Sequence, residues 1–298
     1  MIEIGCAALY PITKYGFPYT LDNYLHAVAE MSEAGFSACE LEINVDIDLE
    51  EYAARLGQVK DTLSVHGMSL SAVIGVVQQA FSLDEASADR TMDRFSHLCQ
   101  VVGQLECPTV CICAYMPAEI QGVAGSEVYR GSPPMQVRTP LDFVWDRFWD
   151  NAVSRLAQMA HTAAEHGQSL VIENRVGDFV NTSDGVLKLV EDSGAPNAGC
   201  LLDVAHTHAT KEHLSLVVPK LAKRLMYVHL ADNDGSHSYH LPAGRGDIDF
   251  PALFRSLHAI GYQGFANVDF GGVPSDKIGE EVRRGRVYFT SCLQEIEE

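Results

Sequence analysis

Residues 169–206 read SLVIENRVGDFVNTSDGVLKLVEDSGAPNAGCLLDVAH and contain two apolar runs on either side of a stretch with helical spacing. The runs 169–175 and 199–205 have the length and composition of buried strands, and residues 183–193 have the period of a helix. Strands that alternate with helices in this way form parallel sheets. The segment therefore predicts a strand–helix–strand unit of an α/β protein.

The same alternation extends over the whole chain of 298 residues. Eight segments have the composition of strands: 2–9, 38–43, 69–75, 109–115, 169–175, 199–205, 226–231 and 265–270. Eight segments have helical spacing: 21–34, 49–63, 84–103, 143–166, 183–193, 212–223, 251–260 and 275–294. Eight units without a Gly-, Ser- or Pro-rich linker favour a closed (β/α)8 TIM barrel over a doubly wound sheet, which normally has about six strands. We expect one domain over residues 1–298.

One segment interrupts this regular pattern. Residues 116–140 lie between the fourth strand and its helix and are rich in proline and glycine. Ordinary connections of this kind have about 2 to 6 residues, so we interpret the segment as an insert. Three roles are open for it: it shapes or covers a pocket, it contacts another subunit, or it decorates the surface.

Charge and composition exclude several classes of function. The chain has 40 Asp and Glu residues against 21 Lys and Arg residues, a formal net charge of −19, which disfavours nucleic acids and anionic membranes. No apolar run approaches the roughly 18 residues of a membrane span, and the first residues lack the basic region of a signal peptide. We therefore expect a cytoplasmic protein. The eight cysteines form no Cys-x-x-Cys pair and are predicted to be reduced and buried.

The last four strands each place one ionisable residue near their carboxyl end. These residues are Glu173, Asp203, His229 and Asp269, which are 30, 26 and 40 positions apart, about one strand–helix unit each. In a TIM barrel the carboxyl ends of the strands meet at one mouth, where chemistry collects. Three carboxylates that converge there repel one another unless a cation compensates them. The pattern therefore predicts a divalent metal site, with oxygen-rich ligands that suit Mn²⁺ or Mg²⁺.

Several short motifs follow one another from Glu173 onward. They include Leu202-Asp203-x-x-His206, then HLADNDG at 229–235, HLPAGRGDID at 240–249 and GYQG at 261–264. In this order and at these spacings, the sequence resembles the xylose-isomerase-like barrels, which include ketose 3-epimerases, hydroxypyruvate isomerase, inosose dehydratase and apurinic endonucleases. The resemblance covers most of the chain. It implies that the four residues at the strand ends bind a divalent metal and that His206 contacts the substrate.

Further site residues come from the loops after the strands. His240 and Asp232 are similar to positions near the metal in this family, and we expect them to bind substrate or to orient ligands. Arg245, between Gly244 and Gly246, is a candidate for binding a substrate hydroxyl or carboxylate. The family usually has glutamate where this chain has Asp269, one methylene shorter. We therefore expect Glu173 to be the main base, with Asp269 and His206 as further catalytic residues.

The expected chemistry is proton abstraction next to a carbonyl, through an enediolate stabilised by the metal. The resemblance implies an isomerase or epimerase of a small sugar or keto-polyol, with Mn²⁺ as the first choice of metal and Mg²⁺, Co²⁺ or Zn²⁺ as alternatives. It also implies association with copies of the chain as dimers or tetramers, and a partner subunit is the alternative.

Three other functions differ in how well the sequence supports them. A lyase acting on a keto-inositol, keto-sugar or keto-glycoside is favoured by Asp269 and by the insert. A barrel that binds a sugar or partner without turnover is disfavoured by the four intact ligands. An apurinic endonuclease is disfavoured because strand four ends Cys113-Ala114-Tyr115 without a histidine, and because Ser238 stands where that group has aspartate.

Overall fold

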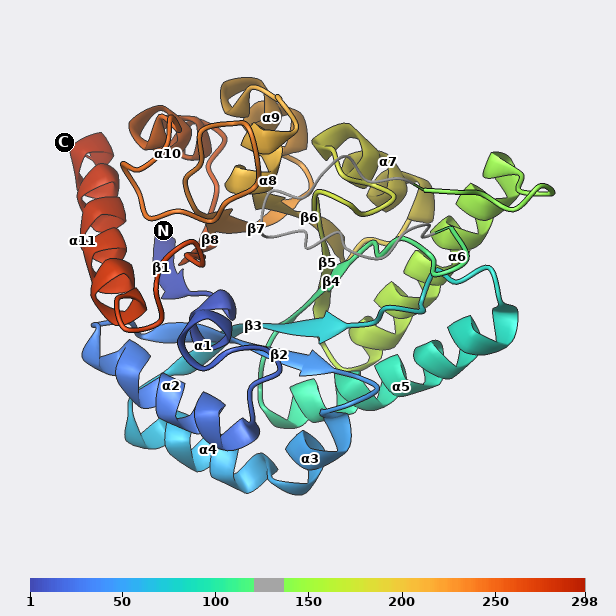
Figure 1. Ribbon diagram of the computed structural model, residues 1–298, viewed down its shortest axis with the longest axis horizontal. Helices are drawn as coiled ribbons and strands as arrows, with labels where there is room; N and C mark the ends of the chain where they lie inside the picture. Colours follow the sequence, from blue (N-terminus) through green and yellow to red (C-terminus); the bar gives the residue numbers. More distant parts are fainter. Residues whose placement is uncertain (121–136, 298) are drawn as a thin grey trace.

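The computed structural model describes residues 1–120 and 137–297, and in it eight parallel strands close into one barrel (Figure 1). The strands follow one another around the barrel in sequence order: β1 (Ile2–Cys6), β2 (Ala38–Asn44), β3 (Ser69–Val76), β4 (Thr109–Cys113), β5 (Ser169–Glu173), β6 (Ala198–Asp203), β7 (Leu225–Leu230) and β8 (Gly264–Val268). Pairing of β1 with β8, from Ile2 opposite Gly264 to Cys6 opposite Val268, closes the sheet. The predicted TIM barrel is confirmed.

Helices alternate with the strands and surround the barrel (Figure 1). Their bounds are α1 (Leu9–Tyr15), α2 (Leu21–Glu33), α3 (Leu49–Ala54), α4 (Leu56–Val65), α5 (Glu85–Gln104), α6 (Trp145–Glu165), α7 (Ser183–Ser193), α8 (Val204–Ala209), α9 (Leu214–Leu221), α10 (Phe250–Ala259) and α11 (Ile278–Glu297). Helix α7 has its predicted bounds. It begins where the Thr182 hydroxyl accepts the Gly185 N–H at 3.2 Å and ends at Gly194, whose φ of 65° suits glycine.

Apolar side chains form two buried layers. The larger layer lies between strands and helices, where residues such as Phe95 and Leu98 of α5 are fully buried. The smaller layer fills the barrel interior and consists of Ala8, Ala72, Ile74, Cys111, Val171, Leu201 and Tyr227. All eight cysteines are buried and free, as expected. The filled interior leaves the carboxyl ends of the strands as the place for a site.

Several predicted elements have different bounds in the structure. The predicted helix 49–63 is two helices, because the chain turns at Arg55 (φ −116°, ψ 21°), close to Gly57, which favours a helix weakly. Helices α1 and α8 were not predicted, because their first residues continue the apolar runs of β1 and β6. Most of the insert 116–140 lies outside the described residues. At its edges, the Arg138 N–H donates to the Ile120 carbonyl at 3.2 Å.

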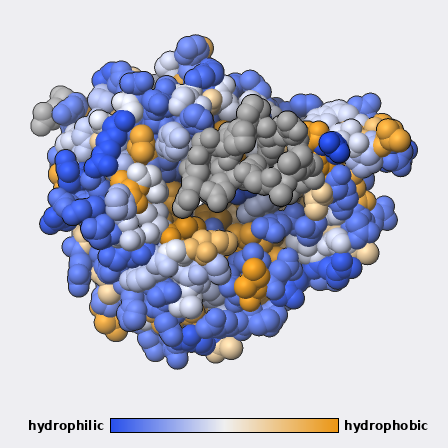
Figure 2. Space-filling view, viewed as in Figure 1, coloured by the Kyte–Doolittle hydropathy of each residue, from blue (hydrophilic) through white to orange (hydrophobic). Residues whose placement is uncertain are grey.

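The outer surface is largely hydrophilic on the face shown in Figure 2, with apolar residues gathered near its centre. Among the described residues, none of the helices combines the length and apolar character needed to cross a membrane.

Candidate functional site

Four ionisable side chains converge at the carboxyl ends of β5 to β8. Glu173 and Asp203 are the last residues of β5 and β6, His229 is the penultimate residue of β7, and Asp269 follows β8 directly. All four are buried. Parallel strands end on the same side of the barrel, so positions that are far apart in the sequence become neighbours in space.

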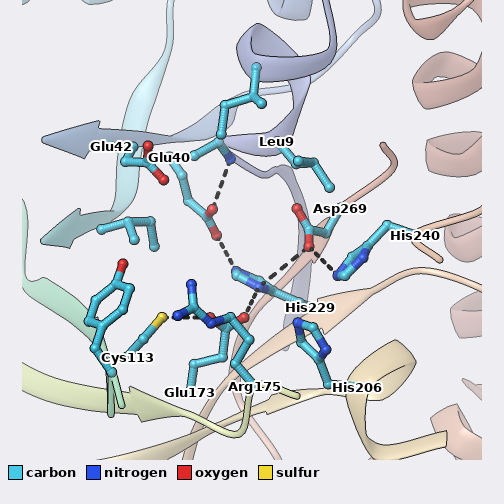
Figure 3. A pocket seen from close by; sticks show the side chains of 14 residues that line it. Leu9, Glu40, Glu42, Cys113, Glu173, Arg175, His206, His229, His240 and Asp269 are labelled. Carbon is cyan, nitrogen blue, oxygen red and sulfur yellow. Dashed lines mark hydrogen bonds and ion pairs between the residues drawn. The ribbon is translucent and has the colours of Figure 1, made fainter. Parts of the chain in front are cut away.

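The imidazole of His229 is the centre of this group (Figure 3). Its Nδ1 atom lies 3.2 Å from Glu173 Oε1, 3.8 Å from Asp203 Oδ2 and 3.8 Å from Asp269 Oδ2. Three carboxylates from three strands therefore face one ring nitrogen. The sequence-predicted ligands are brought to one place.

Two further histidines extend the group. His240 Nε2 lies 3.2 Å from Asp203 Oδ2 and 3.3 Å from Asp269 Oδ2, while its Nδ1 donates to the Ser238 carbonyl at 3.0 Å. The ring of His206 packs edge-on against that of His240, with 4.9 Å between centroids. Among the described residues, candidate ligand atoms gather in two sets, Glu173–Asp203–His229 and Asp203–His206–His240. Asp203 belongs to both.

The charges of these groups depend on one another. The pKa of Glu173 is lowered to about 2, because the hydrogen bond and charge of His229 outweigh burial, which raises it. The pKa of Asp203 is also lowered, since neighbouring imidazoles outweigh the same effect of burial. The pKa of Asp269, by contrast, is raised to about 7 by burial. The pKa of His206 is lowered to about 4, mainly because burial disfavours its charged form.

This donor set fits a divalent cation. Buried carboxylates need positive charge nearby, and here imidazoles supply it to Glu173 and Asp203. Carboxylate oxygens with one or more imidazole nitrogens suit Mn²⁺, Mg²⁺ and related divalent ions. The residues that could hold the ion are therefore Glu173, Asp203, His229 and Asp269, with His206 and His240 within reach of Asp203.

The second oxygen of Glu173 has a different neighbour. The Cys113 thiol donates a hydrogen bond to Glu173 Oε2 at 3.0 Å, whereas Oε1 faces His229. Both residues line a cavity at the mouth of the barrel. Asp269, His206, His229 and His240 line the same cavity. Glu173 thus contacts the candidate metal ligand His229 through Oε1 and also faces the cavity.

Among the other residues that line the cavity are Arg175, Tyr115 and Glu42, which the sequence did not assign to the site. Arg175 lies with its guanidinium carbon 4.4 Å from the centre of the Tyr115 ring and donates to Asp178 Oδ1 at 2.7 Å. The pKa of Glu42 is raised to about 7 by burial. Arg175 and Glu173 are two residues apart, a spacing that places side chains on one face of a strand. This spacing is the sequence feature that could have indicated Arg175. Arg175 lies beyond the end of β5, however, where the alternation of side chains within a strand no longer applies.

Asp232 and Arg245 occupy different places from those predicted. Asp232 is buried, and its carboxylate accepts backbone N–H groups from the loop at 2.9 to 3.2 Å; the donors are Asn233, Gly244, Gly246 and Ile248. Arg245 is half exposed and pairs with Glu281 of α11. In the described part of the chain, neither residue lines the cavity. In this structure Asp232 organises the loop and Arg245 attaches it to α11, and substrate binding by either residue stays a prediction.

Replacement of Asp232 tests this structural role. We expect Asp232→Asn to lower the free energy of unfolding by about 3 kcal/mol, because an amide presents donors to backbone donors and loses the charge that four N–H groups share. Urea unfolding followed by circular dichroism measures the change. The neighbouring Asp234→Asn variant is the control, since Asp234 is exposed and bonds only locally to Ser236. Equal midpoints for both variants would contradict the role.

Comparison with known proteins gives the family. The family model described as "Xylose isomerase-like TIM barrel" matches residues 28–286. The chain belongs to this family. Xylose isomerase-like relatives include the ketose 3-epimerase of Arthrobacter globiformis, 23% identical over 272 residues, which are 88% of this chain and 81% of the relative. The inosose dehydratase of Geobacillus thermodenitrificans (strain NG80-2) is 22% identical over 264 residues, 83% and 82% of the two chains.

Solved structures of other proteins share the fold. A structure of L-ribulose 3-epimerase superposes with a TM-score of 0.76 at 20% identity and covers 100% of this chain and 96% of its own. A structure of the IOLI protein with a bound zinc atom has a TM-score of 0.74 at 15% identity and covers 99% of each chain. Members of the family similar to this chain are thus sugar epimerases and an inosose dehydratase, which places the chain among enzymes.

Proposed function

We propose that this protein is a divalent-metal-dependent isomerase or epimerase of a small ketose or keto-polyol. The proposal rests on the different neighbours of the two carboxylate oxygens of Glu173. Oε1 faces His229 and the other candidate metal ligands, whereas Oε2 accepts from Cys113 in the cavity wall. A carboxylate so placed can contact a metal and a substrate carbon at once. The epimerases among the relatives support this class of reaction.

Glu173, Asp203, His229 and Asp269 are the proposed metal ligands. Their three carboxylates and one imidazole favour Mn²⁺, with Mg²⁺, Co²⁺ or Zn²⁺ as alternatives. The zinc atom in one structural neighbour supports a divalent ion in this fold. His240 contacts Asp203 and Asp269, which makes it a further candidate near the ion rather than a substrate residue alone.

The bound ion would polarise a substrate carbonyl and acidify the adjacent C–H group. Glu173 is the proposed acceptor of this proton, because its carboxylate lies beside the candidate ligands at His229 and faces the cavity. Asp269, with a pKa raised to about 7, can carry a proton at neutral pH and lies on another side of His229 (Figure 3). Return of the proton to the opposite face of the same carbon gives an epimer, and return to the neighbouring carbon gives an isomer.

His206 is the proposed third catalytic residue. It lines the cavity, and its Nδ1 accepts the Val176 N–H at 3.3 Å, which fixes the orientation of the ring. Its pKa of about 4, set by burial, keeps the imidazole neutral at pH 7. A neutral imidazole can donate a hydrogen bond to a substrate oxygen, and this supports a polarising role.

A lyase acting on a keto-inositol, keto-sugar or keto-glycoside is the second candidate. Asp269 has a shorter side chain than the glutamate usual in the family, which makes proton return at the second face less direct. The inosose dehydratase relative supports the same alternative. Abstraction by Glu173 followed by loss of a β-leaving group uses the same first step.

NMR in D₂O distinguishes these reactions. The Mn²⁺-loaded protein is incubated with free ketoses, keto-inositols and 3-keto-glycosides, with EDTA-treated samples alongside, and the metal is removed before spectra are recorded. We expect deuterium to enter next to a carbonyl only in the metal-loaded samples, with an epimer or isomer as product. An eliminated product would establish the lyase. Bound metal without exchange in any substrate would contradict proton abstraction.

A further inference from the structure

A buried carboxylate outside the predicted ligands contacts the far side of His229. Glu40 of β2 is 1% exposed, and its Oε1 lies 2.8 Å from His229 Nε2 (Figure 3). The carboxylates of β5, β6 and β8 face the other ring nitrogen, Nδ1. We propose that Glu40 is a positioning residue that holds His229 with Nδ1 directed at the metal. This inference rests on the proposed function.

The hydrogen bond decides which nitrogen of His229 can bind an ion. An ionised carboxylate only accepts, so the Nε2–H of His229 donates to Glu40. Nδ1 faces Glu173, Asp203 and Asp269, and its own proton is directed at Glu173 Oε1 at 3.2 Å. An ion bound among these carboxylates would replace that proton, and the bond to Glu40 would then keep the remaining proton on Nε2. Partners of this kind fix the tautomer and ring orientation of ligating histidines and raise their basicity.

Glu40 is itself held by two further contacts. Its Oε2 accepts the Ala8 N–H at 2.9 Å, at the junction of β1 and α1, and its Oε1 accepts from Asn267 Nδ2 of β8 at 2.8 Å. Contacts from β1, β7 and β8 thus surround a carboxylate that starts from β2. The carboxylate has little freedom to rotate, which is what a residue that orients another side chain requires.

The support for Glu40 continues into the barrel interior. Asn267 Nδ2 also lies 2.9 Å from Ser71 Oγ and 2.7 Å from the Tyr227 hydroxyl, and these two hydroxyls are 2.7 Å apart. Gly5 of β1 allows Asn267 to sit there, because a Cβ at position 5 would lie 2.3 Å from Asn267 Oδ1. This hydrogen-bonded network therefore joins residues of β2, β3, β7 and β8. The Glu40–His229 hydrogen bond connects it to the candidate metal ligands.

A role only in stability would leave metal binding unchanged, and two measurements separate the roles. The first is Mn²⁺ affinity by isothermal titration calorimetry for Glu40→Gln, which keeps the volume and removes the charge. We expect affinity to fall about 10- to 100-fold, the usual loss when a partner of a ligating histidine is replaced. Glu30→Gln is the control: it removes a half-buried carboxylate that accepts from the Tyr10 and Tyr15 hydroxyls, and Glu30 is not among the described residues that line the cavity. We expect its affinity to change less than about threefold.

The second measurement reads the tautomer of His229 directly in the unaltered protein. Long-range ¹H–¹⁵N correlation spectra of the Zn²⁺-loaded protein, with His229→Gln for assignment, are expected to show a proton on Nε2 and none on Nδ1. A proton on Nδ1 in the loaded protein would overturn the inference even if Glu40→Gln did not fold.

The remaining outcomes are equally decisive. Equal affinity of Glu40→Gln and the unaltered protein, or an equal loss in Glu30→Gln, would mean that Glu40 does not position the ligand, while the proposed function would stand. Failure of the unaltered protein to bind any divalent metal would instead remove the proposed function itself.

Discussion

Glu173→Gln is expected to reduce turnover by at least about 1,000-fold while the barrel remains folded. Loss of a general base typically costs 10²- to 10⁴-fold, and this residue is also a proposed metal ligand. Glutamine has nearly the same volume and keeps an oxygen that can accept from the Cys113 thiol, so the cavity wall is preserved. The amide cannot take a proton from carbon at neutral pH.

Turnover is measured with the substrate identified by deuterium exchange, at a metal concentration that saturates each variant. The control is Glu165→Gln, because Glu165 is exposed near the end of α6, away from the cavity. Its turnover should equal that of the unaltered protein. Retention of more than a few per cent of activity by Glu173→Gln would show that another group is the base.

Asp203→Asn is expected to weaken Mn²⁺ binding by at least about 100-fold, about 2.7 kcal/mol. Asp203 is the only residue shared by the two candidate ligand sets of the described chain, and it is fully buried. Its Oδ2 faces His229 and His240, whereas its Oδ1 accepts the His206 N–H at 2.7 Å at the start of α8. Asparagine preserves that cap and removes the charge, so α8 should remain in place.

Calorimetric titration with Mn²⁺ and thermal unfolding with and without EDTA measure this effect. Metal should raise the melting temperature of the unaltered protein and of the exposed control Asp276→Asn, but not that of Asp203→Asn, because an ion that binds only the native state stabilises it. An unchanged affinity in Asp203→Asn would place the ion elsewhere.

The barrel and the convergence of Glu173, Asp203, His229 and Asp269 could be predicted, because both follow from local order along the chain. The apolar pattern of each strand indicates where that strand ends. Closure of the parallel strands into a barrel then brings these ends together, however far apart they are in the sequence. The helices α1 and α8 were missed because they have only seven and six residues, and their first apolar residues directly extend the predicted strands.

The contacts of Glu40, Asp232 and Arg245 could not be read in the same way. Glu40 meets His229 across the barrel interior, at a separation of 189 residues, and no spacing rule relates β2 to β7. Asp232 and Arg245 lie in a loop after β7, where backbone hydrogen bonds rather than periodicity decide which way a side chain points. Their neighbours depended on the folded path of residues 233–248.

The pairing of β1 with β8 has a consequence for biosynthesis. Asp269 and Asn267 arrive with the strand that completes the barrel, whereas Glu40, Glu173, Asp203 and His229 emerge from the ribosome earlier. A nascent chain that lacks β8 can gather part of the ligand group but cannot surround the ion or complete the contacts of Glu40. On the proposed ligand set, coordination would therefore be completed only at the step that closes the ring.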